Sequence, residues 1–236
     1  VQVLRKAQIS HALCDWRLCE ELEAARSQSP ALRCVGYFGA DAAGSIEHAA
    51  RGKSAEFRNA DTAADDVALI AFTSGTTGVP KGTMHFHRDV IATCEGFPRH
   101  IVGLRSSDLV AGSPSIAFTY GLGGLLLFPL YAGAATLLVE QYTAETMLET
   151  LSRSRASVLF TGPTMYRTLA EHAAGCKLDA LRTCISAGEA LPVPTRQAWE
   201  RATGVQIIDG IGASELLDTF ISAAGKDIRQ VATIAE

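Results

Sequence analysis

The segment at 73–82 combines residue types that suit the binding of a polyphosphate. Its ten residues, TSGTTGVPKG, contain four hydroxyl side chains, three glycines and one lysine. Glycines let a backbone turn so that several N–H groups converge on one anion, hydroxyls add donors, and a lysine adds a mobile positive charge. The spacing is not that of a Walker loop, G-x-x-x-x-G-K-[ST]. A plain flexible turn is the alternative, and the length of the constrained string argues against it.

Two later segments also place polar residues directly after apolar runs. SAGEALP starts at Ser186, and DGIGASE runs from Asp209 to Glu215. A carboxylate beside a polyphosphate suits a hard cation, because Mg²⁺ takes oxygen ligands from protein and phosphate together. Glu215 is therefore a candidate Mg²⁺ ligand, whereas a solvated glutamate at a helix start is the plainer alternative. Without its neighbours, Gly188-Glu189 is an ordinary strand-to-helix turn.

Histidine and cysteine spacing does not favour a metal centre. His85 and His87 alternate with no third ligand nearby in the sequence, a pattern that is usually structural. The six cysteines include no C-x-x-C pair. We therefore expect reduced thiols in a cytoplasmic protein, and the first ten residues, which lack an apolar run, do not support a signal peptide.

Composition favours a small-molecule enzyme. The 236 residues carry a formal charge of −4 with no basic block, which argues against nucleic acid or an anionic membrane as a partner. Hydrophobic residues make up 47% of the chain, enough for a sizeable core. Segment 109–139 has no charged residue, but its prolines and glycines break it into a strand, a short buried helix and a second strand, so we expect no membrane span.

Apolar runs and helical spacing predict alternating strands and helices. We expect an amphipathic helix over 10–26, a strand over 31–38 and an irregular surface connection over 41–66. Helices are expected at 143–154, 163–174 and 194–203, with Pro at the first turn or Gly at the end of the later two. The later strand-sized runs are 67–72, 108–112, 135–139, 157–160, 183–186 and 205–209.

This alternation predicts a parallel sheet with helices on both faces. Ligands of such sheets bind beyond the carboxyl ends of the strands. The polar segments TSGTTGVPKG, SAGEALP and DGIGASE begin where the runs 67–72, 183–186 and 205–209 end. We therefore expect a binding site at that edge.

In order along the chain, TSGTTGVPKG, SAGEALP and DGIGASE resemble the signatures of the acyl-adenylate-forming ligases, which include acyl-CoA synthetases and luciferases. The resemblance implies an α/β fold of layered parallel sheets with flanking helices, the large-domain type of acyl-CoA synthetases, here incomplete. Residues 1–105 would be the C-terminal part of a first α/β subdomain with the phosphate loop. Residues 106–236 would be a second subdomain with the adenine, metal and acyl-pocket motifs.

The same resemblance assigns roles to individual residues. Ser214 would lie near the α-phosphate, Glu215 would bind Mg²⁺, and Lys81 would act with them in catalysis. The residues implied to bind the nucleotide are Thr73, Ser74, Gly75, Thr76, Thr77, Gly78, Lys81, Gly188, Glu189, Ala190, Asp209 and Gly210.

Three segments, MHFHRD, AFTYGLG and DGIGASE, resemble the aryl-CoA ligases for benzoate and 2-aminobenzoate. This implies an ATP-dependent, AMP-forming acid–thiol ligase that uses ATP, Mg²⁺ and CoA on a small aromatic carboxylic acid. Tyr120, Phe128 and Gly212 would line a flat pocket for the ring, although Phe128 is equally well explained as core. Homo-oligomer formation is left open.

Asp218 departs from the pattern of that subfamily. Where the resemblance leads us to expect E-x-L-H-I-F, the chain has ELLDTF, with Asp218 at the position of the histidine. An ionised acid in the pocket would repel a carboxylate substrate unless it is protonated or paired. The ring could then be amino- or hydroxy-substituted, or the site could be impaired.

Several family features are not found in these 236 residues. They are a ribose-binding Asp in a T-G-D motif, a downstream Arg, and a catalytic Lys on a C-terminal lid domain, so we expect a truncated piece in which that domain is absent. A catalytically incomplete nucleotide-binding fragment, or an inert remnant of such a ligase, is the alternative function. Loss of the lysine would remove a transition-state contact.

Overall fold

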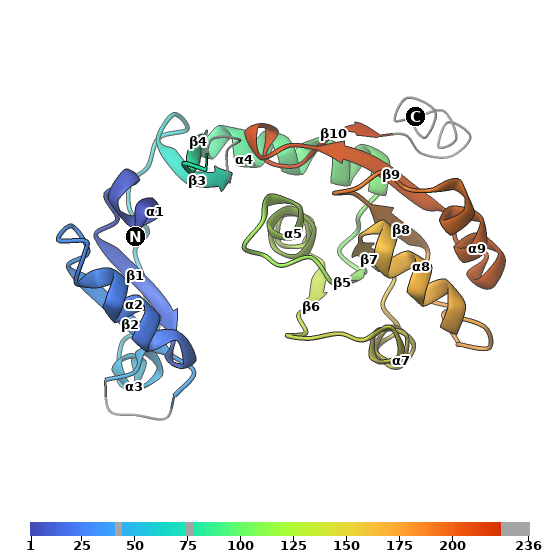
Figure 1. The fold of residues 1–236 in the computed structure, drawn as a ribbon, viewed down its shortest axis with the longest axis horizontal. Coiled ribbons are helices and arrows are strands. Elements are labelled where there is room, and N and C mark those ends of the chain that lie inside the picture. Colours follow the sequence, from blue (N-terminus) through green and yellow to red (C-terminus); the bar gives the residue numbers. More distant parts are fainter. Residues whose placement is uncertain (41–43, 74–77, 223–236) are drawn as a thin grey trace. The chain divides into compact units, whose positions relative to one another are not determined.

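The computed structural model describes residues 1–40, 44–73 and 78–222, and the chain divides into two compact units. The first unit comprises 1–66 and 72–83, and the second comprises 67–71 and 84–236 (Figure 1). In the described part of the chain, no helix is long and apolar enough to cross a membrane. The predicted subdomain division at 105/106 concerns the fold of a longer ligase and stays a prediction.

The first unit contains a parallel pair of strands with short helices. β1 (His11–Asp15) pairs with β2 (Cys34–Phe38) in a register that aligns His11 with Cys34. The prediction of a strand within 31–38 is confirmed. The other elements of this unit are α1 (Gln2–Lys6), η1 (Trp16–Leu18), α2 (Cys19–Arg26) and α3 (Ile46–Ala50), the last within the segment expected to be irregular.

The predicted helix over 10–26 is wrong in its first half. Residues 11–15 form β1, and the regular helix begins only at Cys19. The Asp15 carboxylate accepts a hydrogen bond from the Arg17 N–H at 2.9 Å and so starts the 3₁₀ turn between strand and helix. The spacing of Leu13, Leu18 and Leu22 is what predicts an amphipathic helix here, yet Leu13 is 75% exposed. Pairing with β2 therefore outweighs the helical spacing of the leucines.

Two strands surround the predicted phosphate loop. β3 (Val67–Thr73) and β4 (Lys81–Phe86) form a two-stranded sheet. The prediction of a strand over 67–72 is confirmed. Residues 74–77 of the loop lie outside the described residues.

The second unit is built on a six-stranded sheet with the order β10-β9-β8-β7-β5-β6. All neighbouring pairs among β5 to β9 are parallel, as predicted, and the five strands expected there are present. An antiparallel edge strand, β10, pairs with β9 and was not predicted. The strands are β5 (Leu109–Gly112), β6 (Ala135–Leu137), β7 (Val158–Thr161), β8 (Thr183–Ser186), β9 (Ile207–Gly212) and β10 (Thr219–Ser222).

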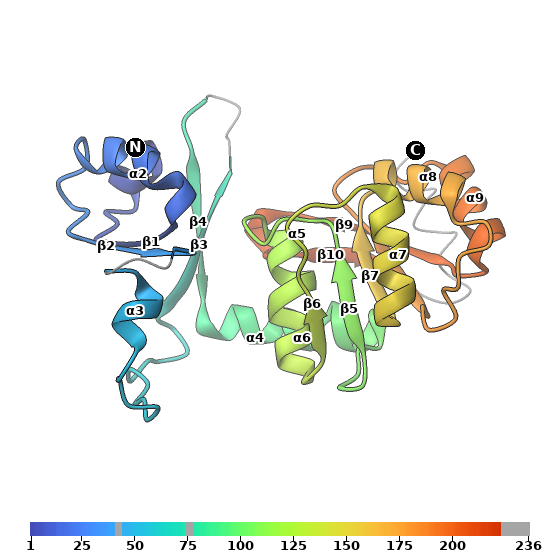
Figure 2. The same cartoon turned by 90° about the horizontal axis from the view of Figure 1, so that it is seen from below.

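Helices cover both faces of this sheet, and Figure 2 shows three of them, α7 to α9, gathered on one side. These helices pack on a core that includes Leu159, Cys184 and Ile207 of the strands. Side chains of the next residues, such as Phe160 and Ile185, point to the opposite face, where a second core forms. The helical elements are α4 (His87–Glu95), η2 (Pro98–Val102), α5 (Thr119–Leu122), η3 (Gly123–Leu127), α6 (Phe128–Ala132), α7 (Ala144–Ser154), α8 (Pro163–His172), α9 (Val193–Thr203) and η4 (Ser214–Leu216).

Local sequence explains the three predicted helices, all of which are present. The Thr143 side chain accepts a hydrogen bond from the Thr146 N–H and caps α7. Pro163 occupies the first turn of α8, and Gly204 ends α9 in a left-handed conformation with φ +73°. In 109–139, the chain runs from β5 through α5, η3 and α6 to β6, which confirms the predicted strand, buried helix and strand.

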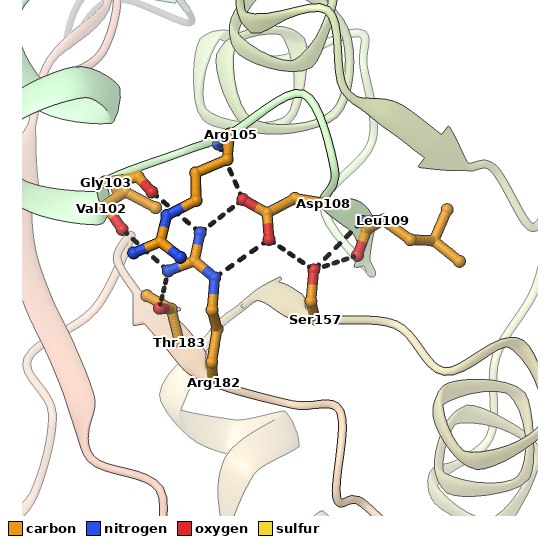
Figure 3. A network of polar contacts seen from close by, with 8 residues as sticks. All are labelled: Val102, Gly103, Arg105, Asp108, Leu109, Ser157, Arg182 and Thr183. Carbon is orange, nitrogen blue, oxygen red and sulfur yellow. Dashed lines mark hydrogen bonds and ion pairs between the residues drawn. The ribbon is translucent and has the colours of Figure 1, made fainter.

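An ion-pair network joins the amino ends of the central strands (Figure 3). The Arg182 guanidinium binds both carboxylate oxygens of the buried Asp108 and also donates to the Gly103 carbonyl at 2.9 Å. Ser157 Oγ donates to Asp108 Oδ1 at 2.8 Å. Burial acts to raise the pKa of Asp108, but the hydrogen bonds from Arg182, Ser157 and the Arg105 N–H outweigh it, and the net pKa is lowered.

Candidate functional site

The register of the six-stranded sheet brings two of the three predicted polar segments, those after 183–186 and 205–209, to one edge. The third follows β3, which pairs with β4 in a separate two-stranded sheet, so its expected place at the edge of the same parallel sheet is wrong. Thr161 at the end of β7 aligns with Ser186 at the end of β8, and Ser186 aligns with Asp209 of β9. The residues after these strands are therefore neighbours in space although they are far apart in the sequence. This agrees with the expectation that a site forms beyond the carboxyl ends of parallel strands.

A cavity of about 180 Å³ lies at this edge. Its wall comes from the start of α5, the loop after β8, the end of β9 and the turn before β10. Five of the predicted site residues line it: Tyr120, Gly188, Gly212, Ser214 and Asp218. Its remaining lining residues are Phe118, Thr119, Ala187, Ala213 and Thr219.

Glycines leave room for this arrangement. A Cβ on Gly212 would lie 3.0 Å from the Asp218 carbonyl oxygen, so a larger residue would press on the turn before β10. Gly188 has φ +92°, a left-handed conformation that side chains rarely adopt. Both predicted glycines therefore have a backbone reason to be glycine at the cavity.

Tyr120 is held in place by two strand carbonyls. Its hydroxyl lies 3.2 Å from the Thr161 oxygen and 3.1 Å from the Ile185 oxygen. Burial, together with the nearby carboxyls of Asp218 and Asp209, raises the pKa of Tyr120 well above its usual range. The ring thus presents a neutral aromatic wall to the cavity at every physiological pH.

Asp218 is a buried acid in the cavity wall, with 3% of its surface exposed. Its Oδ1 accepts hydrogen bonds from the Thr219 N–H at 2.6 Å and the Thr219 hydroxyl at 2.9 Å. Burial raises the pKa of Asp218 to about 7, against the lowering effect of these two bonds. The acid is thus far closer to neutral than an exposed aspartate.

Asp209 and Ser186 form a second buried polar region at the same edge. The Asp209 carboxyl is buried, which raises its pKa, while the charge of Arg196 acts in the opposite direction. Among the described residues, Ser186 Oγ and Asp209 Oδ1 have no hydrogen-bond partner. Buried polar atoms of this kind are normally satisfied by water or a ligand.

Ser214 and Glu215 begin η4 beside the cavity. The His85 ring nitrogen Nε2 lies 2.8 Å from the Ser214 carbonyl oxygen, and His85 is 4% exposed. This contact agrees with the interpretation of His85 as structural. Its part in positioning Ser214 was missed, because a pair separated by 129 residues has no local signal in the sequence.

Glu215 is exposed at this position. Among the residues that the structure describes, no group of three or more His, Cys, Asp or Glu side chains could hold a metal ion. A Mg²⁺ ion bound with a nucleotide needs only one or two carboxylates in addition to phosphate oxygens. A single accessible glutamate therefore fits a cation that arrives with its nucleotide.

Other predicted residues lie elsewhere. Phe128 is 1% exposed and belongs to the core under η3 and α6, outside the cavity lining. Glu189 is exposed and accepts a hydrogen bond from the Thr164 hydroxyl at 3.2 Å. Ala190 is exposed beside it, and Gly210 is buried in β9. In the first unit, Thr73, Gly78 and Lys81 flank 74–77, whose residues Ser74, Gly75, Thr76 and Thr77 lie outside the described part.

A model of the AMP-binding enzyme family matches residues 1–234, nearly the whole chain. The chain belongs to the AMP-binding enzyme family. This membership accounts for the order of the three motifs and for the parallel sheet that brings two of them together. The resemblance inferred from the motifs is confirmed.

Members of the AMP-binding enzyme family that act on aromatic acids are among the relatives. The chain is 40% identical over 179 residues to the benzoate–CoA ligase of Thauera aromatica, a match that covers 74% of the chain and 34% of the relative. It is 36% identical over 167 residues to the anthranilate–CoA ligase of Pseudomonas aeruginosa, with 70% and 32% covered. The chain thus spans about a third of the length of the curated relatives that it matches.

Solved structures of the AMP-binding enzyme family show the same fold. The anthranilate CoA ligase AuaEII in complex with anthranoyl-AMP superposes with a TM-score of 0.84 at 32% identity, covering 94% of this chain and 43% of that one. A benzoate CoA ligase from Burkholderia xenovorans gives 0.80 at 29% identity, covering 93% and 44%. The predicted fold class, a parallel-rich α/β fold of the large-domain type that is incomplete relative to these ligases, is confirmed.

Proposed function

We propose that this chain carries the nucleotide- and acid-binding part of an ATP-dependent, AMP-forming acid–thiol ligase for a small aromatic carboxylic acid. The observation that carries the proposal is the cavity at the carboxyl edge of the sheet. Its lining combines Tyr120, Gly188, Gly212 and Ser214. Such a small, partly apolar cavity with few polar groups suits a planar acid.

The proposed reaction has two halves. The carboxylate of the acid attacks the α-phosphorus of ATP, pyrophosphate leaves, and an acyl-adenylate forms. The thiol of CoA then attacks the acyl carbon, and AMP leaves. Both steps depend on positioning and on neutralisation of phosphate charge, rather than on a covalent bond to the protein.

We assign the polar residues accordingly. Ser214 would donate to the α-phosphate region, and Asp209 with the loop 188–190 would bind the adenine. Lys81 and the hydroxyls and glycines of 73–78 would bind the leaving phosphates. Mg²⁺, held by Glu215 together with the nucleotide, would supply neutralisation of phosphate charge. His85, through its contact with the Ser214 carbonyl, positions the segment that carries both Ser214 and Glu215.

Calorimetry with the 236-residue chain tests the nucleotide part of the proposal. We expect Glu215→Gln to weaken the Mg²⁺-dependent binding of ATP by at least about tenfold. Loss of a residue that only hydrogen-bonds to a metal ligand already lowers metal affinity by about that factor, and loss of a direct ligand should lower it at least as much. Binding of AMP without Mg²⁺ should not depend on this substitution. Glu149→Gln, at an exposed position on α7, is the matched control and should bind as the parent does.

Acyl-hydroxamate formation with benzoate and 2-aminobenzoate tests the acid part. Formation of hydroxamate that depends on both ATP and the acid supports the ligase assignment. Binding of nucleotide without hydroxamate would restrict the chain to the nucleotide-binding role of the alternative. A chain that binds neither ATP nor AMP would contradict the proposal as a whole.

A further inference from the structure

A second cavity, of about 230 Å³, is lined by residues of α4, η2, α6 and the loop before β5. Among the described residues, it shares no lining residue with the cavity at the carboxyl edge of the sheet. We call it the arginine cavity, because Arg99 and Arg105 are part of its lining. The proposed reaction assigns no role to these residues.

The inner wall of the arginine cavity is apolar. Phe128 is 1% exposed and Cys94 is 3% exposed, and Pro98 beside them is also buried. Burial, together with the nearby Asp218 carboxyl, raises the pKa of the Cys94 thiol to about 11, so this thiol is uncharged at neutral pH. A wall of this kind favours a ring or a hydrocarbon chain over an inorganic ion.

The outer part of the arginine cavity carries two cations. Arg99 and Arg105 are exposed, and within the described part of the chain neither guanidinium forms a hydrogen bond or an ion pair. Arg105 contacts Asp108 through its backbone N–H, whereas the guanidinium that binds Asp108 belongs to Arg182 (Figure 3). Two guanidiniums with free donors suit the binding of one carboxylate.

The charge of the arginine cavity is positive. No aspartate or glutamate is among the described residues that line it. Glu95 contacts its edge, where it accepts a hydrogen bond from the Tyr131 hydroxyl at 2.8 Å. This bond raises the pKa of Tyr131, and the charge of Arg99 acts in the opposite direction. Two cations thus face a single carboxylate, which is itself bound to a lining residue.

We propose that the arginine cavity is a separate binding site for a small organic carboxylate. Its apolar body would pack on Phe128, and its charged end would bind Arg99 and Arg105. The cavity is smaller than the roughly 300–1,000 Å³ of sites for drug-sized ligands, so its volume suits a molecule with a single ring. This inference does not rest on the proposed function, because it concerns other residues.

Calorimetry of the 236-residue chain with three small probes tests both parts of the inference. Benzoate carries the charge and the ring, benzamide keeps the ring and the shape without the charge, and acetate keeps the charge without the ring. We expect benzoate to bind at least about tenfold more tightly than benzamide, because hydrogen bonds between charged groups are the stronger ones. Acetate should also bind more weakly than benzoate, because it leaves the apolar wall exposed to water.

Variants assign this binding to the arginine cavity. Arg99→Gln and Arg105→Gln each remove one charge at an exposed position, and each should weaken the binding of benzoate by about tenfold. Ser106→Phe, at an exposed position in the lining, should cover the cavity and remove one equivalent of bound benzoate. Arg167→Gln, an exposed arginine of α8 that lines neither cavity, is the control and should bind benzoate as the parent does.

The outcomes decide the inference without touching the proposed function. Loss of one equivalent of benzoate in Ser106→Phe, with weaker binding in at least one arginine variant, supports it. The inference is overturned if the parent does not bind benzoate or binds benzamide as tightly. It is also overturned if Ser106→Phe keeps every equivalent or if neither arginine variant binds more weakly. The proposed function is judged separately, by nucleotide binding and by hydroxamate formation.

Discussion

Replacing Asp218 with asparagine is expected to change how the stability of the chain depends on pH. The substitution keeps the size of the side chain and an oxygen that can accept the two hydrogen bonds from Thr219. It removes the titration of a carboxyl whose pKa is raised by burial to about 7. The amide N–H group of the asparagine would be buried over Gly123. The free-energy cost of burying it does not vary with pH, because the amide does not titrate.

The size of the effect follows from the two pKa values. A folded-state pKa of about 7 against an ordinary value of 3.8 corresponds to about 4 kcal/mol, at roughly 1.36 kcal/mol per pH unit. The folded chain favours the protonated acid. The stabilisation that comes from protonating Asp218 is therefore fully present below pH 3.8. It is lost as the pH rises to about 7, and above that pH no further change is expected. The difference in free energy of unfolding, Asp218→Asn minus parent, should therefore be about 4 kcal/mol larger above pH 7 than below pH 3.8.

Urea denaturation across this pH range provides the measurement. Trp199 is fully buried in the core of the second unit and reports its unfolding by fluorescence, and Trp16→Phe removes the signal of the first unit. Because parent and variant share all other titrating groups, their difference isolates Asp218. Parallel stability curves for the two proteins would refute the reasoning and show that Asp218 is ionised in the folded chain at ordinary pH.

Two further predictions concern the scaffold and use the same denaturation assay. Arg182→Ala should destabilise the second unit by about 3–5 kcal/mol, because it leaves the buried Asp108 carboxylate without its guanidinium partner. A loss of less than about 1 kcal/mol, the value typical of an ion pair on the surface, would contradict this prediction. Gly112→Ala should cost about 3 kcal/mol, since its Cβ would collide with the Phe160 carbonyl oxygen, which the sheet holds in place. Gly96→Ala, where the nearest atom is 3.5 Å away, is the control and should cost far less.

Much of the second unit could be predicted because its local signals agree with its packing. The apolar runs at 157–160 and 183–186 are buried on both faces of the sheet, so their hydrophobicity is continuous rather than alternating. Pro163 and Gly204 mark a helix start and a helix end with the geometry that these residues favour. In such segments propensity, pattern and tertiary contacts favour the same structure.

The first unit shows why other segments could not be predicted. Over 10–26 the spacing of leucines indicates a helix, yet β1 forms because a parallel partner, β2, is available about twenty residues later. The strand β10 is similar, since its short segment Thr219–Ser222 gains its structure from antiparallel pairing with β9. Strand pairing is a non-local interaction, and a local pattern carries little information about it.

The sequence by itself determined the family, the parallel α/β fold, and the residue types available for nucleotide and acid binding, because motifs and hydrophobic periods are local properties of the chain. Only the tertiary structure decided which of these residues share a cavity. It placed Tyr120 and Asp218 in one wall, left Phe128 in the core, and joined His85 to Ser214. It also decided the protonation of Asp218, because desolvation depends on the atoms packed around a carboxyl and not on its neighbours in the sequence.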